Sequence, residues 1–255
     1  MERGILFREK MIHDIRRRYI AMKTRQAKDW WTLTFGDPMS WLILSMVGDW
    51  KWITPIGITI LSLFVRITGA VTIALGEGES LIWGVFLIQL GVVMDHMDGN
   101  LARYRKITSL SGGFMDRIFD GVSFLAIISG LGWLAVRQGS PIILLLLAPM
   151  TGGFYLVICY IYWSYAYYEL REIGESKKVS PGAIEADQSD IPTWKIIING
   201  QKRILNFHHI DYYFWVSLSI LIGKPAWGVW LLFTVLGVNV ILRFIKRLLS
   251  IEKFD

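Results

Sequence analysis

The chain has 255 residues, of which 53% are hydrophobic, 14% aromatic and 19% charged, and its formal net charge is +6. This composition excludes an ordinary soluble domain and indicates a membrane protein, and the length fits one helical domain. A single cysteine, Cys159, excludes a secreted disulfide scaffold and a zinc cluster.

The first 52 residues are predicted to form a cytoplasmic segment that contains an interfacial helix. Asp37 and Pro38 look like a cap residue and a proline at the first helical position, and the apolar run 39–47 follows them. Tryptophan favours the membrane–water boundary. Four tryptophans lie in or near the run, at Trp30, Trp31, Trp41 and Trp50. We therefore expect a short amphipathic helix along the membrane surface.

Six apolar stretches follow, and each predicts a transmembrane helix. They cover residues 53–75, 81–94, 114–136, 141–168, 207–223 and 226–244. The second stretch is shorter than the usual length of about 18 residues and runs into Asp95 and Asp98, so its helix must continue in a polar setting. The predicted fold class is therefore all-α, a polytopic bundle of six transmembrane helices preceded by the interfacial helix.

The basic residues predict the orientation of this bundle. With the N-terminus inside, 24 of the 27 Lys and Arg fall on the cytoplasmic side. We expect a protein of the cytoplasmic (inner) membrane with both termini and the active site facing the cytoplasm. The predicted divisions are the segment 1–52, a six-helix catalytic domain over 53–247 with a cytoplasmic connection at about 171–206, and a tail over 248–255.

Four carboxylates lie at the ends of the second and third predicted helices. Asp95 and Asp98 are three residues apart and Asp116 and Asp120 four apart, so each pair shares one helical face. A hairpin turns the two faces towards each other. Carboxylates near a bilayer need compensation, and oxygen ligands favour Mg²⁺ or Mn²⁺. Two such ions about 4 Å apart are a recurring device for displacement at phosphorus.

Small and phosphate-binding residues accompany the carboxylates. Gly99, Ala102 and Gly112 leave room for a nucleotide to approach the helix backbone. Arg103 offers a forked donor for phosphate oxygens, and the hydroxyls of Thr108 and Ser109 can contact phosphate or ribose. The segment suits a nucleoside diphosphate.

The spacing from Asp95 to Asp120 matches the signature D-x2-D-G-x2-A-R-x8-G-x3-D-x3-D at all eight positions. In this the chain resembles the CDP-alcohol phosphotransferase (CDP-alcohol phosphatidyltransferase) family. That family often has Pro-Asn-x-x-Thr at the start of its first span. Here Ile56 replaces the asparagine and Thr59 keeps the threonine. The resemblance implies that both residues contact the CDP donor.

The resemblance also implies roles and partners. Asp95 and Asp116 would bridge two Mg²⁺ or Mn²⁺ ions, Asp98 would bind one ion, and Asp120 would bind the other and act as the catalytic base. The reaction would transfer a phosphatidyl group from CDP-diacylglycerol or an ether analogue to an acceptor alcohol, with release of CMP. Membrane lipids are expected partners, nucleic acid is not, and a homodimer is expected because dimers are common in similar families.

Other functions stay open at this point. A soluble CDP-alcohol could instead give its headgroup to a lipid hydroxyl. An intramembrane prenyltransferase would carry two Asp-rich elements far apart, and a cation- or proton-coupled transporter would place its carboxylates near the midplane in related repeats. The acceptor is equally open, with glycerol phosphate, inositol or its phosphate, serine and choline as candidates.

Four further residues have two interpretations each. Arg66 lies inside the first predicted span, where it either snorkels to a lipid headgroup or binds an anion such as a substrate phosphate. Asp211 and the pair His208–His209 begin the fifth predicted span, where they either cap the helix or line an acceptor pocket.

Overall fold

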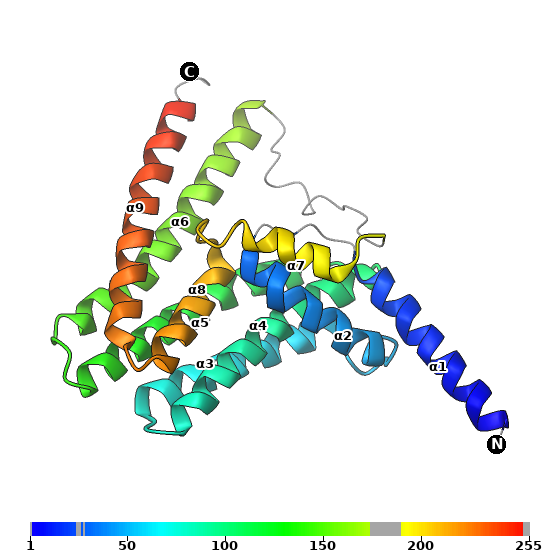
Figure 1. Ribbon diagram of the computed structural model, residues 1–255. Helices are drawn as coiled ribbons and strands as arrows, with labels where there is room; N and C mark the ends of the chain where they lie inside the picture. The colour runs from blue at the N-terminus through cyan, green and yellow to red at the C-terminus, as the bar shows by residue number, and fades with distance from the viewer. Residues whose placement is uncertain (1, 24–26, 28, 174–189, 252–255) are drawn as a thin grey trace. The chain divides into compact units, whose positions relative to one another are not determined.

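The computed structural model describes residues 2–23, 27, 29–173 and 190–251, and only the backbone of residues 2–8 and 10. These residues form helices and turns without any strand, which confirms the predicted all-α class (Figure 1). The elements are α1 (Glu2–Ala21), the π-helical turn η1 (Thr32–Gly36), α2 (Asp37–Val47), α3 (Pro55–Leu75), α4 (Ser80–Tyr104), α5 (Leu110–Arg137), α6 (Leu144–Ile173), α7 (Thr193–Gln201), α8 (His209–Leu221) and α9 (Pro225–Ile251).

Five of the described helices, α3, α4, α5, α6 and α9, are long and apolar enough to cross a membrane. The shortest has 21 residues, about 31 Å at 1.5 Å per residue, which matches a hydrocarbon core of about 30 Å. The chain is therefore an integral membrane protein. The fifth predicted span, 207–223, corresponds to α8, which has only 13 residues and a length of about 20 Å.

The shortness of α8 has a local cause at both ends. Phe207 adopts a left-handed backbone with φ of 46°, so the helix begins only at His209. Gly223 adopts φ of 68° and separates α8 from α9. The described residues therefore contain five long apolar helices where the sequence predicts six.

The predicted interfacial helix is present as α2, but its start differs from the prediction. The N-cap is Gly36, and Asp37 lies in the first helical turn, with Pro38 following it. The helix is entered from the π-helical turn η1, so the chain is already helical before Asp37. The predicted cap at Asp37 is wrong because Asp37 itself has a helical backbone, with φ of −66° and ψ of −48°, whereas an N-cap residue typically has a non-helical one.

Two predicted segments lie partly outside the described residues. The predicted connection at about 171–206 includes residues 174–189, and the predicted tail over 248–255 includes residues 252–255. Within the connection the structure adds α7, a helix that the sequence does not predict.

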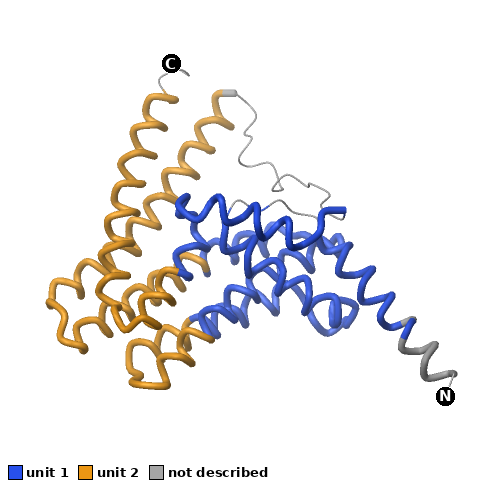
Figure 2. The backbone as a smooth tube through the Cα atoms, viewed as in Figure 1, with its two compact units in different colours: residues 1–66, 87–119, 183–214 blue, residues 67–86, 120–182, 215–255 orange. Residues whose placement is uncertain are grey.

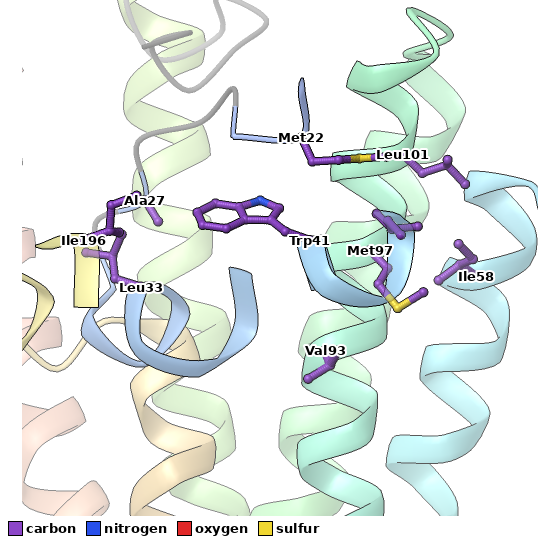
Figure 3. Close-up of a cluster of buried hydrophobic side chains, with 10 residues drawn as sticks. Met22, Ala27, Leu33, Trp41, Ile58, Val93, Met97, Leu101 and Ile196 are labelled. Carbon is purple, nitrogen blue, oxygen red and sulfur yellow. The ribbon is translucent and has the colours of Figure 1, made fainter. Parts of the chain in front are cut away.

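The chain divides into two compact units (Figure 2). The first consists of residues 1–66, 87–119 and 183–214. Its apolar core gathers side chains that come from α2, α3, α4 and α7 and from the segment between α1 and α2 (Figure 3). The core residues are Met22, Ala27, Leu33, Trp41, Leu44, Ile58, Val93, Met97, Leu101 and Ile196.

Polar contacts fasten the connection between α2 and α3 within this unit. The Arg105 guanidinium donates to the carbonyl oxygens of Gly48, Trp50 and Ile53 at 2.6–3.0 Å. Arg18 donates to Asp49 at 2.6 Å. Burial raises the pKa of Asp49, but hydrogen bonds from Arg18 and Tyr104 outweigh it and leave that pKa below its usual value. The connection is thereby tied to the end of α4, where the signature lies.

The second unit consists of residues 67–86, 120–182 and 215–255. Its helices α6 and α9 pack against each other, with the rings of Phe154 and Phe233 5.3 Å apart and Arg247 4.4 Å from the ring centre of Tyr165. A Cβ atom at Gly130 would lie 2.8 Å from the carbonyl oxygen of Ala70. Such close approach through small residues is typical of packed membrane helices.

Candidate active site

A cavity of about 550 Å³ lies within the first unit. It is enclosed by the start of α3, the end of α4, the connection that follows and the start of α5. All seven residues predicted to contact the donor line it: Ile56, Thr59, Gly99, Ala102, Arg103, Ser109 and Gly112. Two of the four predicted carboxylates, Asp98 and Asp116, line it as well. Residues 60 positions apart in the chain, Ile56 and Asp116, thus contribute to one space.

The end of α4 directs the chain along this cavity. Lys106 adopts a left-handed backbone with φ of 55°, and the Ile107 amide bonds back to the Ala102 carbonyl oxygen at 2.9 Å. This is the Schellman ending of a helix, here with lysine in the position that usually holds glycine. It places Ile107 and Thr108 in the cavity wall. The sequence analysis predicts a phosphate or ribose contact at Thr108 but none at Ile107.

The start of α5 also faces the cavity. The Gly112 amide donates to the Ser109 side-chain oxygen at 3.1 Å, so Ser109 caps the helix in addition to lining the cavity. The first turn of a helix carries the positive end of its dipole and unsatisfied amides, which favour anions. The start of α5 therefore favours a phosphate, whereas the Asp98 and Asp116 carboxylates in the same wall would repel one unless a cation were bound.

Arg103 is held in place by a buried amide that the sequence analysis does not identify. Its Nη2 donates to Asn100 Oδ1 at 2.6 Å. Asn100 is 1% exposed, and its own amide donates to Ser40 Oγ at 2.6 Å and reaches Asp37 Oδ1 at 3.4 Å. Helix α2 therefore positions Arg103 through Asn100. No pattern signals this role, because Asn100 occupies an unspecified position of the signature.

Two of the predicted metal ligands in the first unit, Asp95 and Asp116, come close enough to share an ion. Carboxylate oxygens of Asp95 on α4 and Asp116 on α5 lie within 4.8 Å of each other. On the continuous helix α5, Asp120 follows Asp116 by one turn, and their oxygens lie within the same limit. A set of carboxylate oxygens fits Mg²⁺ or Mn²⁺, which prefer such hard ligands.

Asp98 is placed differently from the other three. It is 7% exposed and accepts a hydrogen bond from the Thr59 hydroxyl at 2.5 Å. Asp98 does not belong to the group of oxygens that lie within 4.8 Å of one another. It nevertheless lines the cavity together with Asp116.

Arg66 adopts one of the two arrangements that its position in the sequence suggests, because it is buried and paired with an anion. It is 0% exposed, so it does not snorkel to a headgroup. Its Nη2 forms an ion pair with Asp95 Oδ1 at 2.9 Å, and its guanidinium also reaches Ser62 Oγ at 3.3 Å and the Tyr213 hydroxyl at 3.5 Å. The anion it binds is therefore a predicted metal ligand.

The residues at the start of α8 have a structural role. The Asp211 carboxylate accepts from the amides of Trp31 at 3.0 Å and His208 at 2.8 Å, so it fastens the first turn of α8. This agrees with the capping interpretation of Asp211.

Comparison with protein-family models finds a match to CDP-alcohol phosphatidyltransferase over residues 52–178. The matched segment contains α3 to α6, all four signature carboxylates and every residue that lines the cavity. A search of the curated proteins finds no match. The complete signature and the family match agree, and the chain belongs to the CDP-alcohol phosphatidyltransferase family.

Proposed function

We propose that this chain transfers a phosphatidyl group, or its ether analogue, from a CDP-linked lipid to the hydroxyl of an acceptor alcohol and releases CMP. Family membership supports the reaction class. The observation that carries the proposal is the cavity of about 550 Å³, in which all seven predicted donor contacts meet two of the predicted metal ligands.

The cavity is suited to bind a CDP diphosphate. Gly99 and Gly112 leave the backbones of α4 and α5 without side chains at its wall. Arg103 offers guanidinium donors to phosphate oxygens, and the first turn of α5 adds a favourable dipole. Ile56 gives the wall an apolar side chain where the family often has asparagine.

The four signature aspartates are the residues that would hold two divalent ions, Mg²⁺ or Mn²⁺. When bound, such ions neutralise negative charge on the diphosphate and on the departing CMP. The oxygen-only donor set of Asp95, Asp116 and Asp120 supports this assignment.

The side chains of the protein would transfer the proton of the acceptor hydroxyl and orient the donor diphosphate. We assign Asp120 as the base that accepts the proton of the acceptor hydroxyl. The acceptor oxygen then forms a bond to the lipid-bearing phosphorus of the donor, and the bond from that phosphorus to the CMP oxygen breaks. Asn100 holds Arg103 in place, and Arg103 orients the diphosphate.

The membrane setting completes the proposal. Lipid tails of the donor would leave the site sideways into the bilayer. The distribution of Lys and Arg supports a cytoplasmic site in the cytoplasmic membrane, with both termini inside. A homodimer remains a prediction, which the mass of the purified protein–detergent complex tests.

The test is release of CMP by the purified full chain with Mg²⁺ or Mn²⁺. One arm supplies CDP-diacylglycerol with glycerol phosphate, inositol, inositol phosphate, serine or choline in turn. A second arm supplies a soluble CDP-alcohol with diacylglycerol. We expect acceptor-dependent release in the first arm and a loss of at least about 100-fold in Asp120→Asn. The matched control is Asp14→Asn, which changes a half-buried aspartate paired with Arg17 and should keep full activity.

The arms separate the two directions of transfer. Release only in the second arm would replace the proposed donor with a soluble CDP-alcohol. Acceptor-dependent release that survives in Asp120→Asn would refute its assignment as base, and no release in either arm would refute the transferase proposal.

A further inference from the structure

We propose that Arg66 is a positioning residue for the metal site, which holds the Asp95 carboxylate in the orientation that binds the ion. This inference rests on the metal ligands assigned in the proposed function. It concerns a residue outside the family signature, 29 positions before Asp95 in the chain.

The geometry joins three helices at one guanidinium. Arg66 and Ser62 come from α3, Asp95 from α4 and Tyr213 from α8. Arg66 donates to Asp95 at 2.9 Å and to Ser62 at 3.3 Å through Nη2, and to Tyr213 at 3.5 Å through Nη1. Because Arg66 is completely buried, it cannot reach a substrate in the cavity. Its effect on the reaction must pass through Asp95.

The space for this arginine is built into the neighbouring helix. A Cβ atom at Gly91 would lie 2.3 Å from Cγ of Arg66 and 3.2 Å from its Cδ. Gly91 lies one helical turn before Asp95 on the same face of α4. The absence of a side chain at Gly91 therefore lets the Arg66 stem lie against α4 and bring its guanidinium to Asp95.

The partner on α8 is fixed independently of Arg66. Gln89 accepts from the Trp31 indole at 2.8 Å and donates to the Tyr213 carbonyl oxygen at 3.2 Å. Asp211 holds the same turn of α8 through the Trp31 amide. Tyr213 is thus held by its backbone, and its hydroxyl presents an anchored partner to Arg66.

Charge explains why the position requires arginine. A buried arginine inside an apolar helix is costly unless an anion faces it, and a buried carboxylate requires a cation in return. The planar guanidinium has several donors in fixed directions, so it can bond Asp95, Ser62 and Tyr213 together. A lysine ammonium would keep the charge but would hold fewer of these partners in fixed geometry.

Two effects of Arg66 on an ion have opposite signs, which makes the proposal testable. As a positive charge beside the carboxylates, Arg66 repels a divalent ion, so its removal would tighten binding if charge alone mattered. As a group that orients a ligand, it strengthens binding, so its removal would weaken it. The proposal states that orientation outweighs repulsion.

The experiment measures Mn²⁺ binding without substrate, from the loss of the free-ion paramagnetic resonance signal, by the purified full chain in detergent. We expect Arg66→Met to weaken Mn²⁺ binding about 10-fold or more, as changes behind metal ligands do. The Mn²⁺ affinity of Arg66→Lys should lie between those of Arg66→Met and the unchanged chain. Tyr213→Phe should weaken Mn²⁺ binding less than Arg66→Met does. The matched control is Arg137→Met, which removes an arginine paired with Glu77 in the second unit and should leave Mn²⁺ affinity unchanged.

Unchanged or tighter binding in Arg66→Met would overturn the proposal. If that variant fails to give a single monodisperse species, unchanged binding in both Arg66→Lys and Tyr213→Phe would overturn it. Absence of Mn²⁺ binding by the unchanged chain would overturn the proposal together with the metal assignment. Weakened Mn²⁺ binding in Arg66→Met, in a chain that releases no CMP from any donor, would support Arg66 as positioning residue while refuting the proposed reaction.

Discussion

The Thr59 hydroxyl donates to the Asp98 carboxylate at 2.5 Å, which connects the first turns of α3 to the signature on α4. The same hydroxyl approaches the Pro55 carbonyl oxygen at 3.1 Å. Thr59 is 4% exposed and lines the cavity, so it both shapes the wall and orients one of the proposed metal ligands. Its neighbour Ile56 lines the same wall but is 40% exposed.

Replacement of the Thr59 hydroxyl should impair catalysis more than folding. Thr59→Val keeps the shape but removes the donor to Asp98, and we expect CMP release to fall about 10-fold or more. Thr59→Ser keeps the hydroxyl and should retain most of the activity. Thermal unfolding in detergent should show both variants folded at the assay temperature. Equal activity of Thr59→Val and the unchanged chain would contradict this role.

Loss of the Asn100 side-chain amide should weaken binding of the CDP donor. Asn100→Leu removes the bonds to Arg103 and Ser40, so Arg103 is no longer held towards the diphosphate. We expect KM for the CDP donor to rise about 10-fold with a smaller change in kcat, since a lost bond to a charged group costs about 1.5–3 kcal/mol. The control is Asn239→Leu, which removes an amide that donates to the Val235 carbonyl oxygen within α9. A fall in kcat at constant KM would argue against this assignment.

Removal of divalent ions should abolish the reaction reversibly. EDTA in excess should stop CMP release, and added Mg²⁺ or Mn²⁺ should restore it, because the candidate ligands are carboxylate oxygens. Asp116→Asn should raise the ion concentration needed for half-maximal rate by about 10-fold or more. CMP release that persists after exhaustive dialysis against EDTA would exclude the proposed role of these aspartates.

Addition of a single methyl group at Gly91 should lower the stability of the protein. Gly91→Ala would force Cβ against Cγ of Arg66, near the root of that side chain, and overpacking of this kind costs about 1–3 kcal/mol. We expect a lower Tm in detergent. Gly153→Ala in α6 is the matched control, because its Cβ would meet nothing within 4 Å and alanine favours helix by about 1 kcal/mol. A Tm for Gly91→Ala at or above that of Gly153→Ala would contradict this prediction, because it would show that the Arg66 side chain moves aside without loss of stability.

Most of the helices could be predicted because a long apolar run has few alternatives in a membrane. Backbone groups in lipid must bond within their own segment, so each run becomes a helix whatever lies beside it. The prediction for α8 was two residues too long at each end, because these ends depend on the left-handed residues Phe207 and Gly223. The same reasoning missed α7 and misplaced the cap at Asp37, where the preceding π-helical turn decides the backbone.

The sequence by itself determined which side chains make up the candidate site, because Asp95 to Asp120 lie in one hairpin and their spacing follows the helical repeat. Only the tertiary structure decided how those side chains are held. The partners Thr59, Arg66 and Ser40 precede Asp98, Asp95 and Asn100 by 39, 29 and 60 positions. No periodic pattern connects residues so far apart, and their contacts arise from the packing of α2, α3 and α4 and from the need of each buried charge and amide for a partner.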